Sequence, residues 1–133
     1  MTEQELLHHA IGAKTRAYAP YSNFPVGAAL LAEDGTVFTG CNVENAAYGC
    51  CICAEQTAVV KAVSEGHQKF RAIAVVGNSE GPCLPCGTCR QVLSEFAGSD
   101  LPVICAGADG AFQGYTLGEL LAHSFRLERQ ATL

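Results

Sequence analysis

Two cysteine motifs, with 32 residues between Cys53 of the first and Cys86 of the second, constrain this sequence more than any other feature. The first is Cys53-Ala54-Glu55 and the second is Pro85-Cys86-Gly87-Thr88-Cys89-Arg90. Each motif follows a segment with loop character and stands at the start of a predicted helix. In the second motif the two cysteines are three positions apart, so both thiols project from one face of the first helical turn. Free N–H groups and the positive end of the helix dipole favour anionic thiolates at such positions.

The composition is typical of one compact folded unit. The chain has 133 residues, which is long enough for a single buried core, and we expect one domain over residues 1–133. Apolar residues make up 49% and charged residues only 16% of the chain, which excludes a disordered protein. So low a charged fraction leaves little polar surface for a small monomer and favours an oligomer.

The charge pattern excludes several classes of partner. The formal net charge is −5 and the sequence has no cluster of Lys or Arg, whereas nucleic-acid binders need basic surfaces to neutralise phosphates. The substrate is therefore expected to be small. No apolar run approaches the ~20 residues of a membrane span. Residues 1–5 lack the features of a signal peptide, so we expect a cytosolic protein without membrane contact.

Eight cysteines in a cytosolic chain are expected to be metal ligands or buried apolar residues rather than disulfides. Cys41 and Cys105 lie in predicted strands, and we expect both to be small core residues. The other six fall into the two clusters at residues 50–53 and 83–89. The chemistry is expected there.

Hydrophobic periodicity predicts an alternation of helices and strands. Helices are expected at 4–18, at 53–65 with Gly66 as its C-terminal cap, and at 86–96, closed by Gly98. The apolar residues of the helix at 53–65, Val60 among them, lie nearly all round it, so we expect this helix to be largely buried. Strands are expected at 26–32, 37–43, 72–76, 101–106 and 111–115, and Thr116 is expected to cap a short helix through Leu121.

These elements predict an α/β fold, a three-layer α/β/α sandwich with a five-stranded mixed sheet. Asp34-Gly35 between the first two strands is a strong hairpin signal. The continuous apolar strand at 72–76 is typical of a central strand covered on both faces. The last strands are expected to be connected by right-handed crossovers.

Three cysteine sulfurs with one open position are the arrangement of a catalytic zinc site, whereas four closed positions make a structural one. Glu55, two residues after Cys53, is the acidic residue best placed beside such a metal. Zinc lowers the pKa of a bound water toward neutrality, and a nearby carboxylate can take its proton and pass it on. The combination Cys-x-Glu with Pro-Cys-x-x-Cys is the signature of zinc deaminases of nucleobases.

Two other metal sites fit parts of the same motifs. Cys50-x-x-Cys53 with Cys86-x-x-Cys89 makes two CxxC units, as in a structural zinc ribbon, a module without enzymatic activity. Adding Cys83 gives a spacing similar to part of an iron–sulfur motif. Ribbon cysteines normally sit on tight hairpins, whereas these begin helices, so a three-cysteine zinc site is favoured. Cys50, Cys51 and Cys83 are then non-ligands near the site.

Five motifs, in order and with the right spacing, give the chain a resemblance to a known family over about residues 6–125. It resembles the small, homotetrameric, zinc-dependent type of cytidine deaminase. The motifs are Ala19-Pro20-Tyr21-Ser22, Phe24-x-Val26-Gly27-Ala28, Gly40-Cys41-Asn42-Val43-Glu44-Asn45-Ala46, Cys53-Ala54-Glu55 and Pro85-Cys86-Gly87-x-Cys89-Arg90-Gln91.

The resemblance implies hydrolytic deamination of free cytidine and 2′-deoxycytidine, with one zinc ion per subunit. It implies Cys53, Cys86 and Cys89 as the metal ligands and Glu55 as the proton shuttle. It also implies a set of substrate contacts, some of which complete a neighbouring subunit's site in the tetramer. The ribose-binding residues are Asn42 and Glu44, Phe24 packs on the nucleoside, Tyr48 and Phe125 reach the neighbouring site, and Asn45 and Ala54 complete the set.

Gln56 departs from the family pattern, because relatives with three cysteine ligands usually carry Arg there. Three thiolates on Zn²⁺ leave a net charge of −1, which opposes deprotonation of the bound water, and a neutral amide offsets that charge less than arginine does. We therefore expect the helix-start amides and Arg90 to offset more of it.

Two other deaminases remain as alternatives. A deaminase of a cytosine nucleoside antibiotic such as blasticidin S shares the zinc motifs, but the segment Asn42-x-Glu44-Asn45 suits a plain ribose. A deaminase that edits RNA or DNA is disfavoured by the acidic charge of the chain.

Overall fold

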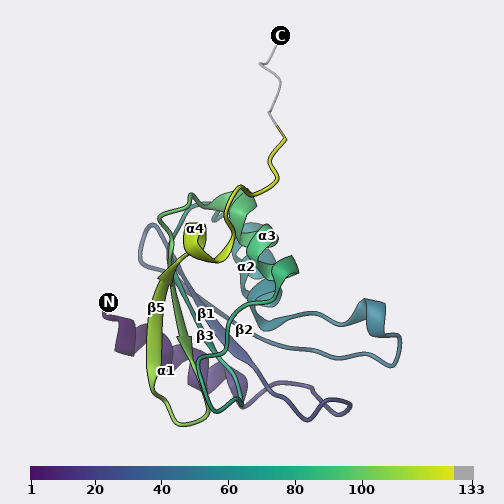
Figure 1. Ribbon diagram of the computed structural model, residues 1–133. Helices are drawn as coiled ribbons and strands as arrows, with labels where there is room; N and C mark the ends of the chain where they lie inside the picture. The colour runs from purple at the N-terminus through teal and green to yellow at the C-terminus, as the bar shows by residue number, and fades with distance from the viewer. Residues whose placement is uncertain (128–133) are drawn as a thin grey trace.

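The computed structural model, which describes residues 1–127, is built on one mixed five-stranded sheet in the order β2-β1-β3-β4-β5 (Figure 1). The prediction of a five-stranded mixed sheet is confirmed. The elements are α1 (Glu3–Lys14), β1 (Gly27–Ala32), β2 (Val37–Cys41), the 3₁₀ turn η1 (Tyr48–Cys50), α2 (Ala54–Ser64), β3 (Phe70–Val76), α3 (Gly87–Phe96), β4 (Pro102–Ala106), β5 (Phe112–Thr116) and α4 (Leu117–Leu120).

Helices cover both faces of the sheet and make the three expected layers (Figure 1). Because successive side chains of a strand point to opposite faces, β1 contributes to two separate clusters. Ala29 and Leu31 pack with Leu6, Leu7 and Ala10 of α1 on one face. Ala28, Leu30 and Ala32, which alternate with them along β1, pack on the other face with α2 and α3, in a larger cluster that includes Ala58, Val59, Ile73 and Leu93.

The pairing of the strands agrees with the sequence prediction at one end of the sheet and differs at the other. β1 and β2 form an antiparallel hairpin around Gly35, whose φ of 96° suits glycine. β3 and β4 are parallel and are connected through α3. The expected crossover between β4 and β5 is wrong, because these strands pair antiparallel and are joined by a turn at Gly110.

The first helix is shorter than its periodicity predicts. It ends at Lys14, where the hydroxyl of Thr15 donates to the carbonyl of Gly12 at 2.7 Å and the next amides make turn bonds. Tyr18, expected in this helix, instead pairs with Val43 in an isolated bridge. The chain thereby turns away from α1 and runs beside the segment that follows β2.

The second helix is less buried than expected. Its Ala58, Val59 and Ala62 face the sheet, but the side chain of Val60 is 60% exposed. The expectation that this helix is largely buried is therefore wrong, and the helix buries one face as a surface helix does. Gly66 follows the C-terminus with a φ of 93°, as its role as a cap predicts. The third helix is not closed by Gly98 in this way: its C-cap is Ala97, in an extended conformation.

The segments at 15–26 and 42–53 project from the body of the molecule on the same side (Figure 1). Backbone hydrogen bonds join the two segments: the Tyr18 amide donates to the Asn42 carbonyl, and the Glu44 amide donates to the Tyr18 carbonyl. Within residues 1–127, none of the helices has the length and apolar character needed to cross a bilayer.

Candidate active site

The two cysteine motifs meet where two helices begin. Cys53 is the N-cap of α2 and Cys86 is the N-cap of α3, and Cys89 lies in the first turn of α3. The backbones of β2 and α2 are in close contact because Gly40 lacks a side chain: a Cβ there would lie 2.6 Å from the amide nitrogen of Ala58. This contact fixes the height at which the start of α2 stands above the sheet.

The three thiols converge as the ligands of one metal ion would. The Sγ atoms of Cys86 and Cys89 are 3.4 Å apart, and those of Cys53 and Cys86 are 3.9 Å apart. Tetrahedral zinc with Zn–S bonds of ~2.3 Å needs sulfur atoms about 3.8 Å apart. In the part of the chain that the structure describes, the group of candidate ligands comprises these three cysteines alone. Cys50 and Cys83 stand outside it, against the ribbon and iron–sulfur alternatives.

The surroundings of the thiols favour a thiolate. The thiols of Cys89 and Cys86 lower the pKa of Cys53 to about 6, against the opposing effect of burial. The pKa of Cys89 is raised, because its thiol donates a hydrogen bond to the sulfur of Cys53 and because it is buried. A first negative charge therefore forms readily at the start of α2, where the helix dipole also stabilises it.

Glu55 lies one residue inside α2, beside the sulfur cluster, and only 4% of it is exposed. Burial raises the pKa of this carboxyl to about 7, and the negative charge at Cys53 adds to the effect. A carboxyl with a pKa near neutrality can both accept and donate a proton at physiological pH. Its position and protonation behaviour suit a proton shuttle.

A cavity of about 290 Å³ opens over the carboxyl and two of the thiols. Of the residues expected at the site, it brings together Phe24, Asn42, Glu44 and Ala54 with Cys53, Glu55 and Cys86. Its remaining walls come from side chains that sequence reasoning did not assign to substrate. These are Val26, Cys51, Ile52, Cys83 and Leu84.

Two of these walls had a usable signal in the sequence. Ile52 directly precedes Cys53, and Leu84 directly precedes the Pro85-Cys86 pair. Both are large apolar side chains that stay exposed in a chain with a well-filled core. The sequence signal is therefore a large apolar residue directly before a predicted metal ligand, which is a candidate for the wall of a ligand site.

Asn42 and Glu44 also hold the loop that carries Phe24. The side-chain amide of Asn42 accepts from the Val26 amide at 2.8 Å and donates to the Phe24 carbonyl at 2.9 Å. Glu44 accepts from the amides of Tyr21 and Ser22 at 2.9 and 3.1 Å, and from the hydroxyl of Ser22. These bonds lower the pKa of Glu44, so its carboxylate is charged at neutral pH.

Three expected substrate contacts lie outside the cavity. The side chain of Asn45 accepts from the Ala47 amide at 2.9 Å, within its own turn. Tyr48 is 77% exposed and lines an adjacent hollow with Tyr21. Phe125 is 69% exposed beyond α4.

Gln56 and Arg90 support the backbone around the cluster. The side-chain oxygen of Gln56 accepts from the Cys53 amide at 3.1 Å, which caps α2. Arg90 donates to the carbonyls of Pro85 and Leu120 at 2.8 and 2.7 Å. The hydrogen bonds of Arg90 go to carbonyls, so the expectation that Arg90 offsets the thiolate charge is not met by them.

Cys41, expected in the core, is only half-buried on β2, whereas Cys105 is fully buried as expected.

Residues 1–106 match the model of a family described as the cytidine and deoxycytidylate deaminase zinc-binding region. The chain belongs to this family. A protein named cytidine deaminase from Sporosarcina psychrophila is 49% identical over 128 residues, which cover 96% of this chain and 94% of that protein. A cytidine deaminase from Mycobacterium tuberculosis is 44% identical over 120 residues, covering 90% of this chain and 86% of the relative.

Solved structures of this deaminase family share the fold. A crystal structure of cytidine deaminase from Burkholderia pseudomallei superposes with a TM-score of 0.91 at 50% identity, covering 94% of this chain and all of that one. The resemblance to cytidine deaminases that the five motifs indicate is thus confirmed. Zinc, the expected cofactor, agrees with the zinc-binding region of the family and with the three convergent thiols.

Proposed function

We propose that this protein is a cytidine deaminase that hydrolyses cytidine and 2′-deoxycytidine to uridine and 2′-deoxyuridine with release of ammonia. The observation that carries the proposal is a buried carboxyl, Glu55, beside three convergent thiols in a cavity that also contains Asn42 and Glu44. The relatives named cytidine deaminase match nearly the whole chain, which supports the same substrate class.

Cys53, Cys86 and Cys89 are proposed to hold one zinc ion as thiolates. When bound, zinc lowers the pKa of a coordinated water and so supplies the nucleophile. The three cysteines leave the side toward the cavity open, because Cys89 is buried beneath while Cys53 and Cys86 line the cavity wall.

Glu55 is proposed to move the protons of the reaction. Its carboxylate accepts a proton from the attacking water, and the resulting acid protonates N3 of the pyrimidine as the new C4–O bond forms. It then takes the second proton of the water and gives it to the exocyclic amine, which leaves as ammonia when the C4–N bond breaks. In the metal-free protein burial raises the pKa of this carboxyl to about 7, and a value near neutrality suits both directions of transfer.

Phe24 and the pair Asn42 and Glu44 are proposed to position the nucleoside. Phe24 offers an apolar face, and the two polar residues keep unused hydrogen-bonding capacity for the 3′-hydroxyl beyond their bonds to the loop. Ala54 contributes cavity wall at the start of α2, and Asn45 holds the turn that follows Glu44.

The assembly is proposed to be a homotetramer of single-domain subunits, residues 1–133, in the cytosol. The support is the exposure of two large aromatic side chains, Tyr48 and Phe125, outside the cavity of their own subunit. Such residues are typical of interfaces rather than of free surface. Each is then available to a neighbouring site.

The decisive experiment replaces Glu55 by Gln and follows the ultraviolet loss of cytidine, with zinc measured in the same sample. We expect turnover to fall by roughly 10²–10⁴-fold, the usual contribution of general acid–base catalysis, while zinc is retained. Glu65→Gln, on the exposed end of the same helix, is the matched control and should leave the rate unchanged. A Glu55→Gln enzyme with near-normal turnover would remove Glu55 from this role.

A zinc chelator should abolish the activity of the unmodified protein. In a separate test of the substrate, blasticidin S should be turned over poorly compared with cytidine. Faster turnover of blasticidin S would instead support the antibiotic alternative.

A further inference from the structure

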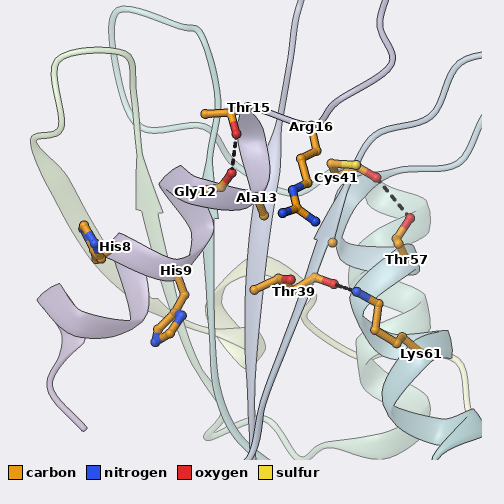
Figure 2. Close-up of a pocket in the computed structure, with 11 residues that line it drawn as sticks. His8, His9, Gly12, Ala13, Thr15, Arg16, Thr39, Cys41, Thr57 and Lys61 are labelled. Carbon is orange, nitrogen blue, oxygen red and sulfur yellow. Dashed lines mark hydrogen bonds between the residues drawn. The ribbon is translucent and has the colours of Figure 1, made fainter.

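A second and larger hollow, of about 600 Å³, lies apart from the catalytic cavity and shares no lining residue with it. It runs between the C-terminal half of α1 and helix α2, across the outer edge of β2 (Figure 2). We call this hollow the β2-edge groove. Its size is within the range of small-molecule sites.

The backbone of β2 turns hydrogen-bonding groups into this groove. In the antiparallel pair of β1 and β2, the Asn42 amide bonds to the Val26 carbonyl and the Ala32 amide bonds to the Thr36 carbonyl. Because bonded pairs alternate with non-bonded pairs, Thr39 and Cys41 direct both their N–H and their C=O groups away from β1. They therefore face the open edge of the sheet.

The carbonyls of Thr39 and Cys41 accept hydrogen bonds from side chains, whereas the amides of these two residues remain free among the residues that the structure describes. Lys61 donates to the Thr39 carbonyl, and Thr57 donates to the Cys41 carbonyl at 3.1 Å (Figure 2). Within residues 1–127, no acceptor is bonded to the amides of Thr39 and Cys41. What β2 offers to a ligand in the groove is thus a pair of N–H donors.

The side chains around the groove add cations to these donors. The guanidinium of Arg16 points into the groove beside Cys41, and Lys61 stands opposite on α2 (Figure 2). His8 and His9 line the α1 side, and each imidazole offers at least one N–H. No carboxylate lines the groove in the described part of the chain, although the net charge is −5; Glu5 lines an adjacent hollow with the two histidines.

This set of groups selects the kind of ligand. A strand of another chain would need free carbonyls on β2 as well as free amides, and the side chains of Lys61 and Thr57 occupy those carbonyls. An anion with several acceptor oxygens fits what remains, and a guanidinium binds phosphoryl oxygens through two parallel bonds.

We propose that the β2-edge groove is a second ligand site, which binds a small phosphoryl-bearing molecule through Arg16, Lys61 and the amides of Thr39 and Cys41. The ligand is either an inorganic phosphate or pyrophosphate or a nucleotide, which share the phosphoryl group. The site does not depend on the deaminase reaction, because none of its residues lines the catalytic cavity.

The test is a titration of ¹⁵N-labelled protein, followed by amide chemical shifts, with orthophosphate, pyrophosphate and uridine monophosphate in separate arms. We expect the amides of Thr39 and Cys41 to shift with saturation. Arg16→Gln should weaken binding by about tenfold, since it removes a charge-assisted bidentate contact, and Arg16→Lys should weaken it less. Arg71→Gln, at an exposed cation on β3 outside the groove, is the matched control and should bind as the unmodified protein does.

Tighter binding of uridine monophosphate than of pyrophosphate would identify a nucleotide, and the reverse would identify an inorganic ligand; both support the site. Equal affinities of Arg16→Gln and Arg71→Gln would overturn it, as would titrations in which the Thr39 and Cys41 amides stay in place. Protection of these two amides from hydrogen exchange that grows with protein concentration, without ligand, would assign the groove to a second copy of the chain and also overturn the proposal.

Discussion

The carboxyl of Glu55 is held where water barely reaches it, and this has a measurable effect on stability. In the metal-free protein its pKa is about 7, above the ordinary value of 4.5 that it takes in the unfolded chain. Because the folded state holds the proton more tightly, the contribution of Glu55 to the free energy of unfolding is fully present below about pH 4.5. It is lost as the pH rises through 7.

Glu55→Gln removes this pH dependence. We expect the stability of the variant relative to the unmodified protein to increase by about 2–3 kcal/mol between pH 5 and pH 8, each pKa unit corresponding to about 1.4 kcal/mol. Urea unfolding of both metal-free, reduced proteins at the two pH values measures it. Parallel pH profiles for the two proteins would show that the carboxyl is not desolvated.

The cysteines around the site are expected to differ in their contribution to zinc binding, and serine substitutions distinguish ligands from non-ligands. Cys53→Ser removes one of three convergent sulfurs, so the protein should lose most of its zinc after gel filtration. Cys83 also lines the cavity, but it stands outside the cluster, and its pKa is raised to about 11 by burial. Cys83→Ser should therefore retain zinc. Equal zinc contents in the two variants would contradict the three-sulfur site.

The chemistry-bearing residues could be predicted from the sequence because their spacing is set by local helix geometry. Cys53, Cys86 and Glu55 lie at helix starts, and a helix start fixes where neighbouring side chains point. The second role of Asn42 and Glu44, holding the loop before β1, could not be predicted. It depends on a contact between segments about 20 residues apart, for which the sequence carries no periodic signal.

At the scale of elements, the packing of α2 on β2 depends on Gly40. A methyl group there would meet the Ala54 carbonyl and lie 2.6 Å from the Ala58 amide, and backbone cannot yield as a flexible side chain can. We expect Gly40→Ala to destabilise the protein by about 1–3 kcal/mol through overpacking, and to lower activity by displacing Cys53 and Glu55. Thermal unfolding and cytidine turnover measure the two effects.

Gly12→Ala is the control for Gly40→Ala. A Cβ at Gly12 meets nothing within 4 Å, and the residue lies inside α1, so alanine should stabilise by about 0.5–1 kcal/mol. If both alanine variants changed stability in the same direction, the close contact of β2 with α2 would not be the cause.

Glycines that adopt a positive φ mark the ends of elements correctly, whereas Gly98 at the end of α3 and the ends set by distant contacts do not follow from the sequence. Asp34-Gly35 and Gly66 placed a turn and a helix end correctly because positive φ is a property of single residues. The end of α1 and the pairing of β4 with β5 were missed. Both depend on which distant segment a strand or loop lies against, as Tyr18 lies against Val43.

At the scale of the whole molecule, the described residues after α4, 121–127, are held against α3 rather than against the cavity. Gln91 donates to the Phe125 carbonyl at 2.9 Å, and Arg126 donates to the Ala97 carbonyl at 2.9 Å. The ring of Phe125 is nevertheless 69% exposed. A fixed backbone with an exposed aromatic ring fits the proposed tetramer, since little entropy would be lost if a neighbouring subunit covered the ring.

Hybrid tetramers test whether Phe125 serves a neighbouring site. Phe125→Ala alone should raise KM, and Glu55→Gln alone should be inactive. In co-expressed hybrids, a Phe125→Ala subunit has its own Glu55 and can receive an intact Phe125 from a Glu55→Gln neighbour. We therefore expect part of the activity to return with the KM of the unmodified enzyme, in particles whose tetrameric mass is checked by sedimentation. If Phe125 acted within its own subunit, every site with Glu55 would lack it, and hybrids would keep the raised KM throughout.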